Sequence, residues 1–69
     1  MEMGRKIAEL RLLNGWTQKE LAKRVLISPS YISRIEEGNI PRPRAKTLAR
    51  IANALGVKVG ELYEEDQDE

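Results

Sequence analysis

Apolar residues recur at intervals of three and four positions in four separate stretches of the chain, which is the spacing of one face of an α-helix. No stretch alternates apolar and polar residues in the way that a half-buried β-strand does. A shorter apolar segment near the C-terminus adds one more expected helix. The expected helices cover residues 4–14, 18–25, 29–37, 44–55 and 57–63. We therefore predict an all-α fold, a compact bundle of about five short helices.

The second and third expected helices each begin with a capping signal. Thr17 and Glu20 are spaced to form a capping box, in which each side chain accepts a hydrogen bond from the backbone amide of the other residue. Ser28 is a preferred N-cap, and Pro29 fits the first helical position because an N–H there would have no helical partner. The few residues between the two helices leave room only for a tight turn. Residues 17–38 therefore predict a helix-turn-helix.

The third expected helix has an inward and an outward side, since each residue advances about 100° around the axis. The inward residues are Ile32, Ile35 and Glu36. The outward residues are Ser30, Arg34 and Glu37, with Tyr31 and Ser33 on the flanks. A helix with such a polar side fits the major groove of DNA, where its first turns face base edges. The alternative is a plain helical hairpin that binds no nucleic acid.

The composition narrows the possible functions. The 69 residues form one domain, and oligomerisation would add to the thin stability margin of so small a core. The sequence contains no cysteine and no histidine, which excludes disulfides, thiolate or imidazole metal sites, a nucleophilic cysteine and the usual general base. We therefore expect no metal, no cofactor and no enzymatic activity.

Charge is unevenly distributed along the chain. Residues 1–50 contain eleven Lys and Arg against five Asp and Glu, a net charge of +6, whereas residues 51–69 contain one against six, a net charge of −5. The basic part contains the helix-turn-helix. This asymmetry favours an anionic partner, although a mixed-charge surface without any partner gives the same pattern.

The ends of the chain suggest where the protein acts and how far its domain extends. No apolar run approaches the ~20 residues of a membrane span, and the N-terminus lacks the apolar region of a secretory signal, so we expect a cytoplasmic protein with no membrane partner. We expect residues 1–63 to form the domain and residues 64–69, EEDQDE, to form a disordered acidic tail. The tail either keeps the protein soluble or competes with DNA for the basic surface.

Three segments of the sequence follow a known pattern. They are I-x-x-x-R ahead of GWTQKELA, then SPSYISRIE-x-G, and then P-x-x-x-x-L-x-x-I-A-x-A-L-G-V. Through these motifs residues 7–62 resemble the Cro/CI-type, phage repressor-like helix-turn-helix family. The resemblance implies a lambda-repressor-like bundle of five helices that binds operator DNA, commonly as a symmetric homodimer.

The resemblance also implies roles for individual residues. Gln18 would contact a phosphate at the start of the second helix, and Arg42 and Arg44 would meet the DNA backbone after the third. Arg34 is the best candidate for reading a base, because a guanidinium can pair bidentately with guanine; a solvated surface arginine is the alternative. The candidate DNA-binding residues are Gln18, Ser28, Pro29, Ser30, Tyr31, Ser33, Arg34, Asn39, Arg42 and Arg44.

Three positions depart from the family pattern. Leu26 stands in the turn where many members have glycine, so either a non-glycine residue adopts a left-handed conformation or the turn differs. Pro29 replaces a residue that often hydrogen-bonds a base. Arg44 replaces the usual capping serine or threonine and is expected to favour phosphate binding. Tyr31 is left open between a contact to DNA and a half-buried structural role.

Two further groups have structural assignments. Arg11 and Glu36 both face the core, and the resemblance places them as an ion pair that joins the first helix to the third. Loss of one partner would leave the other charge uncompensated. The apolar residues near the end of the chain either complete the core or form a dimer interface. They are Val57, Val59, Leu62 and Tyr63.

Together these features predict a sequence-specific DNA-binding transcriptional regulator, in its simplest form a repressor that binds a pseudo-palindromic operator as a homodimer. No small-molecule ligand is indicated. An antitoxin, a restriction-modification controller or a phage immunity repressor would carry the same domain. The alternative from a different class is a protein-interaction module that has kept the fold and lost DNA binding.

Overall fold

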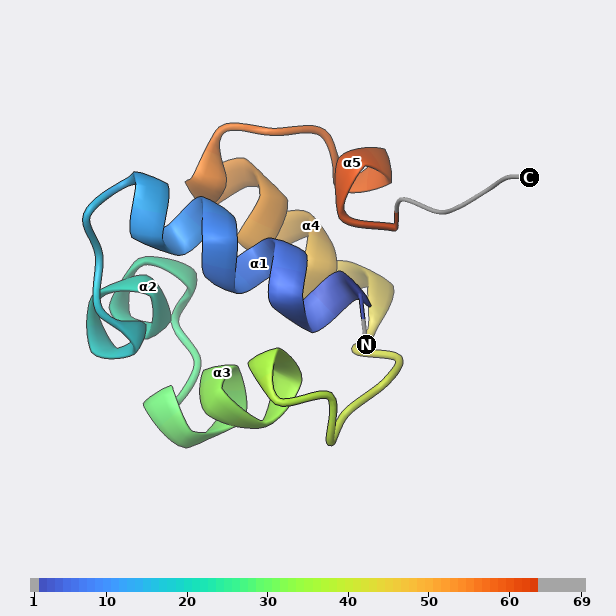
Figure 1. Cartoon of the computed structure of the whole chain (residues 1–69), viewed down its shortest axis with the longest axis horizontal. Coiled ribbons are helices and arrows are strands. Elements are labelled where there is room, and N and C mark those ends of the chain that lie inside the picture. The colour runs from blue at the N-terminus through green and yellow to red at the C-terminus, as the bar shows by residue number, and fades with distance from the viewer. Residues whose placement is uncertain (1, 64–69) are drawn as a thin grey trace.

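The computed structural model describes residues 2–63, which fold into five α-helices joined by short loops (Figure 1). The helices are α1 (Glu2–Leu13), α2 (Gln18–Val25), α3 (Pro29–Glu36), α4 (Ala45–Leu55) and α5 (Val59–Tyr63). No strand occurs between residues 2 and 63, and the predicted all-α bundle is confirmed. The acidic tail expected at residues 64–69 lies outside the described residues.

The helix boundaries fall within two residues of those expected, and the differences at α4 and α5 have local causes. α4 begins one residue later because the backbone of Arg44 is extended, with φ −61° and ψ 148°. α5 begins two residues later because Val57 belongs to the turn that closes α4. The amide of Val57 donates to the carbonyl of Ala52 over 3.0 Å, and Gly56 before it is left-handed with φ 77°.

The caps of α2 and α3 form as the sequence predicts. Thr17 Oγ1 accepts from the amide of Glu20 over 3.0 Å, and Glu20 Oε1 accepts from the amide of Thr17 over 2.8 Å. Ser28 Oγ accepts from the amide of Tyr31 over 3.2 Å, and Pro29 is the first residue of α3. A side-chain cap of this kind contributes about 1 kcal/mol, so local sequence fixes where both helices begin.

Leu26 connects α2 to α3 in a left-handed conformation, with φ 60° and ψ 41°. Of the non-glycine residues between 2 and 63, it alone has a positive φ. This conformation costs roughly 1–2 kcal/mol, because the Cβ atom crowds the following carbonyl oxygen. The side chain is 79% exposed, so burial within this chain does not offset the strain.

A single apolar core lies between the helices. α2 packs on α3 and α4, α1 packs on α3 and α5, and α4 packs on α5. Figure 1 shows α1 crossing the front of the molecule with α4 behind it and α3 at the lower edge. The buried core residues are Ile7, Leu21, Ala22, Val25, Ile32, Ile35, Leu48, Ile51, Ala52, Leu55 and Leu62. All five helices contribute to this core, which anchors the inward side of α3.

Gly4 lets the start of α1 approach the end of α3. A Cβ atom at this position would collide with the carbonyl oxygen of Ile35 and would lie 2.7 Å from the carbonyl oxygen of Glu36. Both obstacles are backbone atoms, which cannot move aside as the end of a flexible side chain can. Glycine therefore permits the close contact between α1 and the last turn of α3.

Candidate nucleic-acid interface

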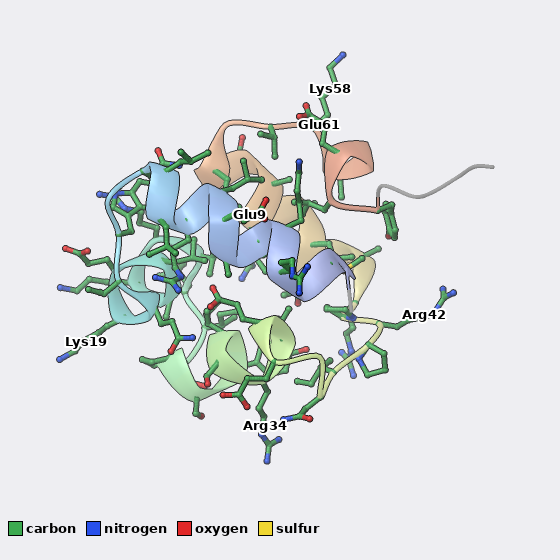
Figure 2. The ribbon with its side chains drawn as sticks, in the orientation of Figure 1. Glu9, Lys19, Arg34, Arg42, Lys58 and Glu61 are labelled. Atoms are coloured by element: carbon green, nitrogen blue, oxygen red, sulfur yellow. The ribbon has the colours of Figure 1, made fainter. Side chains whose placement is uncertain are left out.

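The outward side of α3 is polar and open to solvent. Ser28, Pro29, Ser30 and Arg34 are exposed along it. Arg34 projects away from the bundle (Figure 2). On the opposite side of the helix, Ile32 is completely buried. Since α3 cannot rotate without exposing core residues, these exposed side chains are presented on a fixed frame.

A shallow cavity of about 490 Å³ lies between the start of α3 and the start of α4. Its lining residues are Ile27, Ser28, Tyr31, Arg44 and Thr47. Arg44, the N-cap of α4, makes no capping hydrogen bond with its side chain, so the first amides of α4 have no side-chain acceptor at the cap. Free helix amides beside a guanidinium attract a phosphate group. The cavity thus brings three of the sequence candidates, Ser28, Tyr31 and Arg44, to one place suited to an anion.

The loop between α3 and α4 presents two arginines on either side of a buried proline. Pro43 is buried, whereas Arg42 and Arg44 are exposed. Arg42 extends from the loop into solvent (Figure 2). The buried ring fixes the loop to the bundle and so keeps both guanidinium groups at the surface, where each can pair with phosphate oxygens.

Glu36 links three helices through one carboxylate. Arg11 of α1 donates from Nε to Glu36 Oε2 over 2.8 Å and from Nη2 to Oε1 over 3.1 Å. Gln18, the first residue of α2, donates from Nε2 to Oε1 over 2.9 Å. Arg11 also donates from Nη1 to the carbonyl of Trp16 over 2.8 Å. The side chains of Arg11 and Glu36 are only 11% and 7% exposed, so this network ties α1 and α2 to α3 largely out of contact with water.

Gln18 therefore has an internal role that the sequence did not indicate. The resemblance suggests it as a phosphate contact, but the residue is half-buried and its side-chain amide already donates to Glu36. A glutamine amide has two hydrogens, so one remains for a phosphate. The hydrogen bond to Glu36 therefore orients the Gln18 side chain.

Glu37 joins two other candidate residues at the end of α3. Ser33 Oγ donates to Glu37 Oε2 over 3.1 Å, and Asn39 Nδ2 donates to Glu37 Oε1 over 3.3 Å. Both side chains are thus held by an exposed carboxylate, which repels phosphates and can accept a hydrogen bond from the exocyclic amine of cytosine. The sequence put Glu37 on the outward side, but it was not among the candidates, because an acidic residue on a basic surface does not suggest DNA binding.

The four apolar residues proposed as core or dimer interface separate into two groups. Leu62 is completely buried within this chain, so it belongs to the core and we remove it from the candidate interface. Val57 is half-buried and packs against the core. Val59 and Tyr63 are 39% and 51% exposed. Val57, Val59 and Tyr63 keep exposed surface, so a dimer interface at these three residues stays a prediction.

Among the side chains that the structure describes, residues 3–63, no group of three or more carboxylates, thiols or imidazoles lies close enough to hold a metal ion. No helix in the same range has both the length and the apolar character needed to cross a bilayer.

A family model described as helix-turn-helix matches residues 7–62. An uncharacterised HTH-type transcriptional regulator of Methanocaldococcus jannaschii is 34% identical over 67 residues, which cover 97% of this chain and 100% of that protein. The immunity repressor protein of Bacillus phage phi105 is 33% identical over 66 residues, which cover 96% of this chain and 45% of the repressor. The chain thus spans less than half the length of the phage protein.

A solved structure has the same arrangement of helices. It is the crystal structure of SinR, the master regulator for biofilm formation, in complex with DNA. The TM-score is 0.87 at 29% sequence identity, and the match covers 90% of this chain and 98% of that chain. The fold described above is therefore that of a protein crystallised on DNA.

Proposed function

This chain belongs to the Cro/CI-type helix-turn-helix family, and from that premise we propose that it is a sequence-specific DNA-binding transcriptional regulator. The observation that carries the proposal is the outward side of α3, where Ser30 and Arg34 are exposed while the inward side is locked into the core. The likeness to SinR, which was crystallised with DNA, supports it. The family match favours a regulator over an enzyme.

In the proposed complex α3 lies in the major groove. Arg34 pairs with a guanine through two hydrogen bonds, a contact that discriminates against other bases by about 1–3 kcal/mol. Arg42 contacts one phosphate, and the cavity lined by Ser28, Tyr31 and Arg44 accommodates another. Because backbone contacts set the position and base contacts set the specificity, these phosphate contacts fix the register in which Arg34 reads the sequence.

We further propose that the regulator is a repressor that binds a pseudo-palindromic operator as a homodimer. Val59 and Tyr63 are exposed and offer apolar surface to a second copy. Burying that surface in a dimer would stabilise a domain of this size. Two copies of α3 would then enter successive major grooves on one side of the duplex, with half-sites ~34 Å apart. The likeness to a phage immunity repressor supports repression over activation.

Selection of bound duplexes from a random pool tests this proposal. We expect an enriched palindrome whose half-sites are about one helical turn apart. An enriched motif without symmetry would contradict the homodimer and leave DNA binding intact. If no sequence is enriched and the protein shows no salt-dependent retention on nonspecific DNA, DNA binding itself is wrong and the protein-interaction module takes its place.

A further inference from the structure

A second concave surface lies between the end of α2 and α4. It is a cavity of about 580 Å³, larger than the cavity beside Ser28 and Arg44. Its lining residues are Arg24, Val25, Leu26, Arg50, Asn53 and Ala54, a set we call the α2–α4 groove. None of these residues belongs to the candidate nucleic-acid interface, so an inference from this groove does not rest on the proposed DNA binding.

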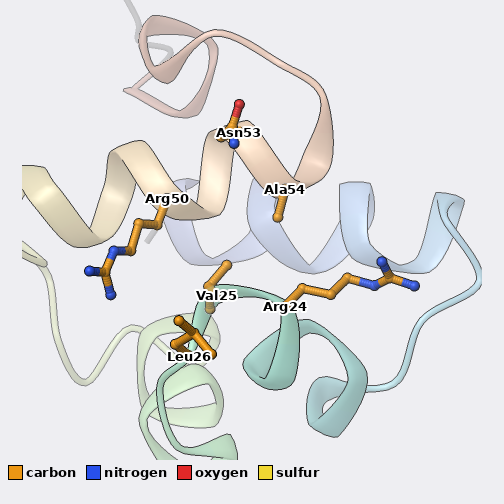
Figure 3. Close-up of a pocket in the computed structure, with 6 residues that line it drawn as sticks. All are labelled: Arg24, Val25, Leu26, Arg50, Asn53 and Ala54. Carbon is orange, nitrogen blue, oxygen red and sulfur yellow. The ribbon is translucent and has the colours of Figure 1, made fainter.

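The groove combines an apolar centre with a basic rim. Val25 is buried and Ala54 is half-buried, while the side chain of Leu26 is 79% exposed. Figure 3 shows Arg50 of α4 and Arg24 of α2 extending on opposite sides of this apolar centre. No acidic residue lines the groove. No carboxylate in the groove therefore neutralises the charge of Arg24 or Arg50.

Leu26 contributes little to the stability of the fold. Its backbone is left-handed, a conformation that glycine adopts without strain, and its large apolar side chain faces water. Another exposed leucine, Leu13, is 82% exposed, but it lies in regular helix, where leucine is a favoured residue. Contact with a partner would bury this exposed side chain, and that burial would offset the cost of the left-handed backbone.

The two arginines are suited to carboxylates. The guanidinium of Arg24 stacks on the ring of Trp16, 4.1 Å from its centroid, which restricts the conformations of its side chain. Arg50 is exposed, and no carboxylate in residues 3–63 forms an ion pair with it. A planar guanidinium pairs with a carboxylate through two parallel hydrogen bonds, so each is ready to bind an acidic side chain.

We propose that the α2–α4 groove docks an acidic segment of a partner protein, in which an apolar side chain packs on Leu26 and flanking carboxylates pair with Arg24 and Arg50. The charge of the rim selects against basic and neutral segments, and the exposed leucine selects against anions that have no apolar group. The DNA backbone, which carries phosphates and offers little apolar surface here, is the rival occupant.

A titration with a short synthetic peptide of single Leu residues flanked by Glu tests the proposal. NMR spectra of the full chain should show saturable shifts at the amides of Val25, Leu26 and Ala54. A peptide with Lys in place of Glu should cause none. Arg50→Glu should weaken binding by about fivefold or more, because it removes an exposed ion pair, worth up to about fivefold, and adds repulsion between like charges. Arg5→Glu on the exposed surface of α1 should leave binding unchanged.

Leu26→Gly separates docking from folding, because it should raise the stability of the protein and lower its affinity for the peptide. Glycine relieves the left-handed strain, so the melting temperature should rise, whereas peptide binding should fall by about tenfold through loss of the apolar contact. Leu13→Ala, which removes an exposed leucine elsewhere, should leave peptide binding unchanged.

Three results would overturn the proposal. The first is a peptide affinity that Leu26→Gly leaves unchanged, and the second is peptide-induced shifts that never saturate. The third is an absence of peptide binding while Arg50→Glu loses more affinity for nonspecific DNA than Arg5→Glu does; this result would assign the groove to the DNA backbone. DNA selection by the wild-type chain is independent of all three results, so failure here is distinguishable from failure of the proposed function.

Discussion

Arg34 and Arg42 carry the same guanidinium, but in the proposed complex one meets a base and the other a phosphate. Arg34→Ala should weaken binding to the selected operator by about 5- to 150-fold, equivalent to 1–3 kcal/mol, and should relax the preference at one base pair per half-site. Arg42→Ala should instead weaken all duplexes alike and lower the slope of log affinity against log salt by about 1 per protomer. Dissociation constants on the operator and its single-base variants at several salt concentrations measure both effects.

Arg42→Ala is the matched control for Arg34→Ala. Each variant removes one exposed arginine, so the net charge falls by the same amount in both. Equal losses for Arg34→Ala on every sequence would show that Arg34 contacts the backbone rather than a base.

Arg11 and Glu36 concern stability rather than recognition. Arg11→Met leaves a carboxylate that is only 7% exposed with no cation beside it, so the free energy of unfolding should fall by about 3–5 kcal/mol. A domain of this size has little more than that in reserve, so the variant should melt far below wild type or unfold. Thermal denaturation followed by circular dichroism measures the loss.

The double variant Arg11→Met with Glu36→Leu identifies the cause of that loss. Because it removes the uncompensated charge as well, it should regain much of the stability. Wild-type-like melting of Arg11→Met alone would mean that water or the Gln18 amide solvates Glu36 well enough without the arginine.

At the scale of helices, the elements that sequence predicts well are those whose signals are local. The capping box joins Thr17 to Glu20, only three positions apart, and the bounds of α2 agree with the prediction. At Leu26 the sequence left two alternatives open, a left-handed residue or a different turn, and the structure has the left-handed residue. The contact between Gln18 and Glu36 spans 18 positions and depends on how α2 and α3 pack, which no spacing rule reports. For the same reason the sequence suggests Gln18 as a DNA contact but not as part of the core network.

The packing of α1 on α3 gives a prediction at this scale. Gly4→Ala raises the intrinsic helix propensity of α1 by about 1 kcal/mol, but its Cβ would collide with the carbonyl oxygens that end α3. Overpacking of this kind costs about 1–3 kcal/mol, so the net effect should be destabilising by up to ~2 kcal/mol and should lower the melting temperature by several degrees.

Gly60→Ala is the matched control, because no atom lies within 4 Å of the Cβ that it would add in α5. This variant should be neutral or slightly stabilising, since alanine is the better helix former. If both variants melt alike, the approach of α1 to α3 is looser than the structure indicates.

For the whole molecule, the sequence predicted the fold class and the outward side of α3 but not the concave surfaces. The cavity lined by Ser28, Tyr31 and Arg44 joins the start of α3 at Pro29 to the start of α4 at Ala45, and the α2–α4 groove joins Leu26 to Arg50 across the bundle. Surfaces of this kind arise only when elements pack, so residues such as Arg50 carried no signal in the sequence. Charge, by contrast, is a property of composition and was accessible from the start.

The charge distribution leads to the last prediction, for which we propose residues 1–63 as the folded DNA-binding unit. The full chain has 12 Lys and Arg against 11 Asp and Glu, and five of the acidic residues lie in residues 64–69, so truncation after Tyr63 changes the net charge from +1 to +6. We expect the truncated chain to keep its helical circular dichroism and to bind DNA several-fold more tightly at low salt. The gain in affinity should vanish as salt screens charges farther apart than about 10 Å at 0.1 M.

Replacing the tail with Asn and Gln of equal length should reproduce the gain in affinity. An unchanged affinity in that variant would mean that the acidic charge does not compete with DNA.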